Sequence, residues 1–87
     1  MSHYVYIIYS ESSDVHYKGE AVDVYKRLEA HNSGMSTYTR GKGPWRLVYI
    51  EEFSTRTEAL KREKMLKRQN RRYIEWLILQ PINQLHS

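Results

Sequence analysis

The segment YVYIIYSESSDVHYKG, residues 4–19, contains two runs typical of β-strands with a polar cluster between them. The cluster, residues 11–14, has the composition of a hairpin loop. If the loop has two or four residues, antiparallel pairing sets Tyr6 opposite Gly19 and places Tyr6 and Tyr17 on one face, diagonally adjacent. Because Gly19 has no side chain, the ring of Tyr6 can lean over it and the two hydroxyl groups can converge. The hairpin is therefore predicted to carry a site that contains two phenols.

The length and composition indicate one small domain. The chain has 87 residues, which fit a single core, and no cysteine, which excludes disulfides and thiolate metal ligands. The apolar run of residues 4–9 is too short for a signal peptide and far too short to span a bilayer. We expect a cytoplasmic protein that does not bind membranes, with a domain at residues 3–80 and a C-terminal tail at residues 81–87.

The positive charge is concentrated in the C-terminal third. Residues 1–55 carry six Lys/Arg and seven Asp/Glu, whereas residues 56–76 carry eight Lys/Arg and three Asp/Glu. A basic helical segment is typical of a surface that binds phosphates, although a solvated helix face rich in lysine has the same composition. The cations that we assign to nucleic-acid binding are Lys64, Lys67, Arg68, Arg71 and Arg72.

The rest of the chain predicts a helix, a strand and two further helices. Asp23 is a suitable N-cap for a helix that ends near residues 32–34, and a loop at residues 35–44 leads into a strand at residues 45–50. Ser54 or Thr55 begins the second helix, and the third includes residues 73–78. Together with the hairpin, this gives three strands and a fold of the α+β class.

Two helices carry side chains with catalytic chemistry. Arg27 and His31 are one turn apart and flank Leu28, at the border of the buried face, from which they could reach the sheet. Alternatively, His31 interacts with the helix dipole while Arg27 lies along the surface. Glu63 falls within the apolar stripe of its helix, where it either pairs with Lys67 or binds a hard cation.

In combination, these residues resemble the GIY-YIG nuclease superfamily, in its small stand-alone bacterial branch that is similar to the N-terminal nuclease domain of excinuclease. The first half-motif falls at residues 5–7 and the second at residues 17–19. The similarity continues through residues 27–32, 36–40, 44–49 and 58–63 and covers about residues 3–78. Each half-motif is weak alone, but their order and spacing, with an R-x3-H helix and a glutamate-bearing helix, are specific.

The resemblance implies a three-stranded antiparallel sheet flanked by helices, and the cleavage of phosphodiester bonds with one Mg²⁺ or Mn²⁺ ion. Glu63 would hold the metal, and Tyr6 would orient or deprotonate the attacking water and pass a proton to His31. Arg27 would bind phosphoryl oxygens and Tyr17 would position water or phosphate. Tyr38 and Arg40, on the loop, are weaker candidates for substrate contact.

The expected substrate is structured or damaged DNA, with RNA as the less favoured possibility. Affinity and target choice are expected to come from the basic helix or from a partner protein, without strong sequence specificity. Two further hypotheses are a nucleic-acid-binding module without turnover, and a structural interaction domain in which the tyrosines are ordinary strand residues. The sequence does not define the oligomeric state.

The sequence also departs from the family pattern at two positions. Lys18 replaces the usual apolar or small middle residue of the second half-motif, and we expect it to point outward without disturbing Tyr17. Many family members have an asparagine well downstream of the metal-binding glutamate, but Asn70 lies only seven residues after Glu63. Asn70 is therefore left outside the predicted site.

Overall fold

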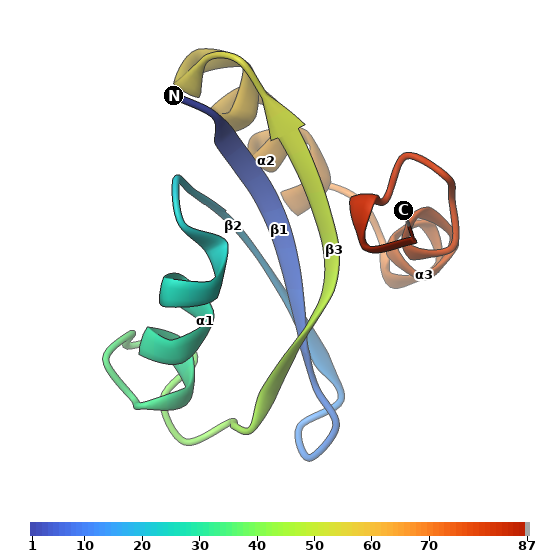
Figure 1. Ribbon diagram of the computed structural model, residues 1–87. Coiled ribbons are helices and arrows are strands. Elements are labelled where there is room, and N and C mark those ends of the chain that lie inside the picture. Colours follow the sequence, from blue (N-terminus) through green and yellow to red (C-terminus); the bar gives the residue numbers. More distant parts are fainter. Residues whose placement is uncertain (87) are drawn as a thin grey trace.

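The computed structural model describes residues 1–86 and contains one sheet of three antiparallel strands. The strands are β1 (His3–Ser10), β2 (Val15–Ala21) and β3 (Trp45–Phe53), and β1 lies in the middle of the order β2-β1-β3 (Figure 1). The prediction of an α+β fold with a three-stranded antiparallel sheet flanked by helices is confirmed.

The register of the opening hairpin follows from its four-residue loop. Tyr6 pairs with Gly19 and Ile8 pairs with Tyr17, as the sequence predicts for a loop of this length. Asp14, at the end of the loop, has a φ of 54°, a left-handed conformation that aspartate tolerates better than most residues. The ring of Tyr6 lies directly over Gly19, where a Cβ atom would come within 2.5 Å of the phenol oxygen.

Each helix begins at a side-chain cap. Helix α1 (Val24–Asn32) is capped by Asp23, α2 (Arg56–Lys67) by Thr55, and α3 (Arg71–Ile78) by Asn70, whose side chain accepts a hydrogen bond from the Tyr73 amide. Asn70 therefore has a structural role. Strand β3 extends three residues beyond the predicted end, because its pairing with β1 continues to Phe53. The acidic pair Glu51-Glu52 interrupts the apolar pattern there, so the sequence pattern does not indicate the true end of the strand.

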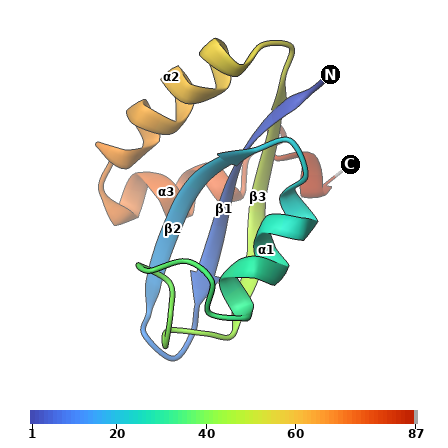
Figure 2. The same cartoon turned by 90° about the vertical axis from the view of Figure 1, so that its left-hand side faces the viewer.

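The sheet separates two small cores, because side chains of β1 alternate between its faces. Helices α2 and α3 cover one face, where the buried residues are Val5, Ile7, Tyr49, Ala59, Leu66, Ile74 and Leu77. Helix α1 covers the other face, with Tyr6, Ile8, Ala21, Val24 and Trp45 (Figures 1 and 2). Tyr6 thus lies on the α1 side of the sheet, next to the edge strand β2.

The segment that follows α3 is attached to the sheet by one asparagine. The Asn83 side chain is fully buried, donates hydrogen bonds to the Val48 and Ile78 carbonyls, and accepts one from the Ile50 amide. The predicted tail at residues 81–87 therefore packs on the domain as far as it is described, with a short 3₁₀ helix at Gln84–His86, while Ser87 lies outside the described residues. No helix within residues 1–86 combines the length and apolarity that a membrane span requires.

Candidate active site

A buried chain of hydrogen bonds joins the opening hairpin to α1 and to the loop that follows it. The Tyr6 hydroxyl lies 2.8 Å from His31 Nε2, and His31 Nδ1 lies 2.8 Å from the hydroxyl of Thr39. All three side chains are about 1% exposed. The strand, the helix and the loop are thus connected through the two nitrogens of one imidazole.

Thr39 has a second hydrogen-bond partner, the Ser36 carbonyl, and this contact indicates which nitrogen of His31 carries the proton. The Thr39 hydroxyl is also 3.5 Å from the Ser36 carbonyl oxygen, which can only accept a hydrogen bond. When Thr39 donates to Ser36, it accepts from His31 Nδ1, and Nε2 is left to accept from the Tyr6 hydroxyl. This tautomer gives Tyr6 a proton acceptor inside the fold.

Burial keeps both partners of the Tyr6–His31 contact neutral. Desolvation raises the pKa of Tyr6 above 10.0, while the Arg27 guanidinium acts in the opposite direction. Desolvation, followed by the charge of Arg27, lowers the pKa of His31 below 6.5. At neutral pH the pair is therefore a phenol that donates and an imidazole that accepts.

Tyr17 extends the site toward solvent. Its ring lies 4.8 Å from the His31 ring and 6.4 Å from the Tyr6 ring, so the two phenols of the hairpin share one face as predicted. Tyr38 stacks on the outer side of Tyr17 at 5.7 Å, and Lys42 Nζ lies 4.5 Å from the centre of the Tyr38 ring. Tyr38, which was predicted on the loop as a weaker candidate for substrate contact, therefore lies next to the site.

Two charged residues complete the cluster. Arg27 is exposed, and its guanidinium is close enough to influence the pKa values of both Tyr6 and His31. The Glu63 side chain is 17% exposed and pairs with Lys67 at 3.4 Å, which confirms the i,i+4 ion pair as one of its roles. Its charge also reaches Tyr6 and raises the pKa of the phenol. Tyr6, Tyr17, Arg27, His31 and Glu63 therefore gather in one region.

The donors near Glu63 fit a metal with few protein ligands. Within residues 1–86 no group of three or more His, Asp or Glu side chains is arranged to hold an ion. Mg²⁺ commonly binds through one or two carboxylates and takes its other ligands from water and substrate phosphate. A single half-buried carboxylate is compatible with that mode of binding, and the metal at Glu63 stays a prediction.

The predicted nucleic-acid-binding cations differ in their surroundings. In the described part of the chain Lys64, Arg68 and Arg72 form no ion pair and are exposed. Arg71 instead binds Asp14 at 2.6 Å and Glu75 at 3.1 Å, so these carboxylates offset its charge. The Nε of Arg40 donates to the Gly34 carbonyl, which turns this side chain toward the end of α1.

A groove that we call the edge groove runs from the site along the edge strand. It has a volume of about 220 Å³ and is lined by His16, Tyr17, Lys18, Tyr38 and Lys67. Lys18 is half-buried, and desolvation followed by the charge of Lys67 lowers its pKa. Lys18 was expected to point outward without disturbing Tyr17, but the pairing of β2 with β1 and the position of α2 leave it half-buried in this groove.

Thr39 was not among the site residues predicted from the sequence. The residue was part of the matched segment 36–40, but a threonine in a loop carries no periodic signal, and its contact with His31 depends on how the loop folds back on α1. One local feature pointed to Thr39: it follows Tyr38, which was already a candidate for substrate contact.

Comparison with known proteins shows the family to which the chain belongs. A family model described as the GIY-YIG catalytic domain matches residues 2–76. The chain belongs to the GIY-YIG family. This domain is 44% identical over 66 residues to UPF0213 protein SSP2268 of Staphylococcus saprophyticus, which covers 75% of this chain and 79% of the relative. It is 40% identical over 79 residues to UPF0213 protein BH0048 of Halalkalibacterium halodurans, with 90% and 83% of the two chains covered.

Two solved structures have the same fold as this GIY-YIG domain. The NMR structure of UPF0213 protein BH0048 from Bacillus halodurans matches with a TM-score of 0.58 at 40% identity, over 90% of this chain and 83% of the other. The NMR structure of protein EF2693 from E. faecalis matches with a TM-score of 0.60 at 32% identity, over 92% and 90%. The family is one of nucleases, so nucleic acid is the partner class that it implies.

Proposed function

We propose that this GIY-YIG domain is a divalent-metal-dependent endonuclease that hydrolyses phosphodiester bonds in structured or damaged DNA without strong sequence specificity. The observation that supports it most is the contact of 2.8 Å between the Tyr6 hydroxyl and His31 Nε2, with Tyr17, Arg27 and Glu63 around it. Hydrolysis of a phosphodiester needs a route for the proton of the attacking water and groups that stabilise charge on the phosphate.

The Tyr6–His31 pair supplies the proton route. Tyr6 orients the attacking water through its phenol oxygen and transfers its own proton to Nε2 of His31, while it takes a proton from the water. Because the pKa of Tyr6 is raised and that of His31 is lowered, this transfer is unfavourable in the resting protein. Positive charge near the phenol lowers the pKa of Tyr6 and so favours this proton transfer, and the Arg27 guanidinium supplies such charge.

The other groups act on the phosphate. Arg27 binds nonbridging oxygens through its planar guanidinium, and Tyr17, at the exposed side of the site, donates a hydrogen bond to the phosphate or to water. Glu63 would hold one Mg²⁺ or Mn²⁺ ion, which supplies polarisation of the phosphate and stabilisation of the leaving oxygen. Lys64, Arg68 and Arg72 bind the flanking phosphates, and DNA is the favoured substrate over RNA.

A nicking assay tests this proposal. A flapped duplex is incubated with Mg²⁺ or Mn²⁺ and with wild type, Tyr6→Phe or Glu63→Gln. We expect both variants to lower the rate by about 100-fold or more, because each removes a group that acts in the transition state. The matched controls are Tyr25→Phe, at a tyrosine that is 64% exposed on α1, and Glu58→Gln, at the exposed start of α2.

Equal nicking by wild type and both active-site variants would contradict the mechanism. Salt-sensitive binding of the flap without any nicking, with or without metal, would instead support the alternative of a nucleic-acid-binding module that retains the fold. The two results are separated by measuring binding and cleavage on the same substrate.

A further inference from the structure

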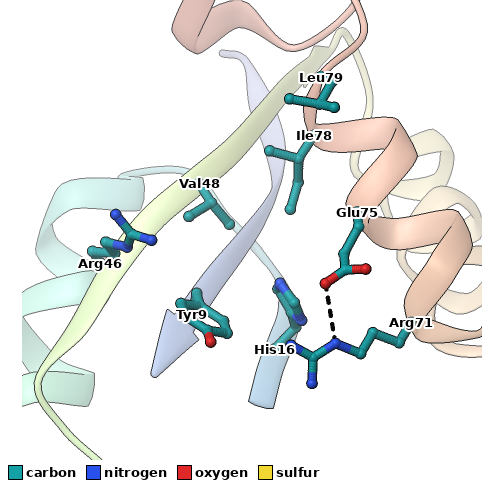
Figure 3. A pocket seen from close by; sticks show the side chains of 8 residues that line it. All are labelled: Tyr9, His16, Arg46, Val48, Arg71, Glu75, Ile78 and Leu79. Atoms are coloured by element: carbon teal, nitrogen blue, oxygen red, sulfur yellow. Dashed lines mark hydrogen bonds and ion pairs between the residues drawn. The ribbon is translucent and has the colours of Figure 1, made fainter. Parts of the chain in front are cut away.

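A second aromatic cluster lies on the face of the sheet opposite to Tyr6. Tyr9 of β1 pairs with His16 of β2 on one side and with Arg46 of β3 on the other, so the three side chains form a row across the sheet. The Tyr9 and His16 rings are 4.8 Å apart, and the Arg46 guanidinium carbon is 5.5 Å from the centre of the Tyr9 ring (Figure 3).

Helix α3 provides the opposite wall of a hollow above this row, which we call the Tyr9 hollow. Glu75 and Ile78 face it from α3, Leu79 faces it from the end of the helix, and Val48 of β3 lies between them and the row (Figure 3). The volume is about 330 Å³, within the usual range for small-molecule sites. Leu79 is 75% exposed, so the apolar part of the hollow is open to a ligand.

The charges of the Tyr9 hollow do not favour a phosphate. Arg71 borders it, but its guanidinium binds Asp14 and Glu75, and Glu75 is itself an anion on the wall. Desolvation, with the charges of Arg71 and Lys18, lowers the pKa of His16, so this ring is neutral at pH 7. Arg46 is the one cation on the sheet side of the hollow, and it pairs with Glu11 at 3.5 Å. The lining suits a planar, partly apolar ligand with hydrogen-bond donors at its edge.

A nucleobase has this chemistry. Proteins that bind single strands stack unpaired bases on aromatic rings and recognise them through hydrogen bonds at their edges. Tyr9 and His16 offer rings, and the Glu75 carboxylate can accept from an exocyclic amino group, which adenine, cytosine and guanine have and thymine lacks.

The Tyr9 hollow is continuous with the active site around the edge of β2. It shares His16 and Arg71 with a neighbouring hollow of about 250 Å³, which in turn shares His16, Lys18 and Tyr38 with the edge groove beside Tyr17. A strand that has its phosphodiester at Tyr17 can therefore follow Lys18 and His16 to the other face of the sheet.

We propose that the Tyr9 hollow binds an unpaired, amino-bearing nucleobase in a single-stranded extension of the strand that this nuclease cuts, by stacking on Tyr9 and hydrogen bonding to Glu75. The inference rests on the proposed function, because it takes the occupant to be part of the substrate. It implies that the substrate has a single-stranded arm beside the cleaved bond.

Binding to the metal-free protein tests the inference without cleavage. Short single strands of deoxyadenylate, deoxycytidylate, thymidylate and abasic units are titrated into the labelled protein, with affinity from anisotropy and location from NMR amide shifts. We expect the adenine and cytosine strands to bind about five-fold more tightly than the thymine strand, because their exocyclic amino groups donate to Glu75, whereas the N3–H of thymine lies between two carbonyl oxygens that the carboxylate repels. Amides at Tyr9, His16 and Leu79 are expected to shift with base-bearing strands and not with the abasic strand.

Variants separate the two contacts. Glu75→Leu, at an exposed side chain, removes the carboxylate that accepts and is expected to abolish the preference for amino-bearing bases. Tyr9→Leu is expected to weaken the binding of base-bearing strands by about five-fold or more. Tyr25→Leu, the same change at an exposed tyrosine on α1, is the matched control and should bind as wild type does.

The outcomes distinguish this inference from the proposed function. If strands bind and shift only amides of α2 and of the edge groove, the inference is overturned while the nuclease proposal stands. Equal affinity for thymine and cytosine strands, unchanged in Glu75→Leu, also overturns it. If no single strand binds anywhere on the protein, the inference is overturned, while the nuclease proposal is decided separately by the nicking of the flapped duplex.

Discussion

At the scale of single residues, the site depends on two close packing relations of Tyr6. Its ring occupies the space over Gly19, where a Cβ atom would meet the phenol oxygen at 2.5 Å, and its hydroxyl contacts His31. The imidazole is held from its other side by Thr39. Substitutions at Gly19 and Thr39, which carry no catalytic group, are therefore expected to change the rate of cleavage.

Thr39 is predicted to position His31. Thr39→Val keeps the shape of the side chain but removes the partner of Nδ1, which leaves a buried polar nitrogen unsatisfied at a cost of about 1–3 kcal/mol of folding free energy. We expect a change in the tautomer of His31, observed through its ring ¹⁵N shifts, and nicking slower by about ten-fold or more. Thr39→Ser should restore both, and an unchanged ring spectrum in Thr39→Val would argue against this role.

His31 is also predicted to make stability depend on pH. Its pKa is below 6.5 in the folded protein, so at pH values between the folded pKa and 6.5 the unfolded chain binds more protons. The free energy of unfolding should therefore fall as the pH drops below 6.5, and the lowered pKa of His16 acts in the same direction. Cleavage should persist below pH 6.5 and decline only as the pH falls through the lowered pKa of His31.

The measurement is a series of urea midpoints between about pH 7 and about pH 5, with the NMR titration of His31 beside it. In His31→Gln the midpoint should depend less on pH, because one of the two shifted imidazoles is gone. A titration of His31 at or above 6.5 would contradict the account, as would an equal pH dependence in the variant.

At the scale of secondary-structure elements, the C-terminal segment fixes the position of β3 and α3. The Asn83 side chain binds backbone groups of both elements, at Val48, Ile50 and Ile78. The face of α3 that forms one wall of the Tyr9 hollow therefore depends on a contact made beyond the end of the helix. Arg71 adds a second brace, because it joins the start of α3 to the hairpin loop through Asp14.

Asn83→Ala is predicted to destabilise the fold by about 2–4 kcal/mol, because it leaves several buried backbone groups without partners. Urea denaturation measures the loss. The control is Asn70→Ala, which removes the exposed cap of α3 and should cost about 1 kcal/mol. A loss at Asn83 no greater than that at Asn70 would show that the segment is not held through this side chain.

At the scale of the whole molecule, the uneven charge defines one basic surface along α2 and the start of α3. The exposed Lys64, Arg68 and Arg72 have no acidic partner within residues 1–86, whereas Arg56, at the other end of α2, lies 3.7 Å from Glu20. Lys67, on the same helix as Lys64, lines the edge groove, so α2 borders both the groove and the basic surface.

Binding of flapped DNA to the metal-free protein is predicted to weaken steeply with salt, with a slope of about −0.9 in log affinity against log salt for each phosphate contacted. Neutralising Lys64, Arg68 or Arg72 to Gln should reduce the slope by about one contact each. Arg56→Gln is the control, since Glu20 already offsets that charge. Slopes that do not change in the three variants would place the phosphates elsewhere on the surface.

The amino-acid sequence by itself determined the order of the strands and α-helices, the hairpin register and the cap of α1, and its resemblance to the GIY-YIG family named the five residues of the candidate site. These depend on local pattern and on pairing at short range, as Tyr6 with Gly19 and Asp23 with the start of α1 show. Only the tertiary structure decided the roles of Thr39, Lys18, Asn83 and the Tyr9 hollow. Their partners are distant in sequence, so no periodicity or spacing records the contacts, which exist only once the loop, the helices and the sheet have packed.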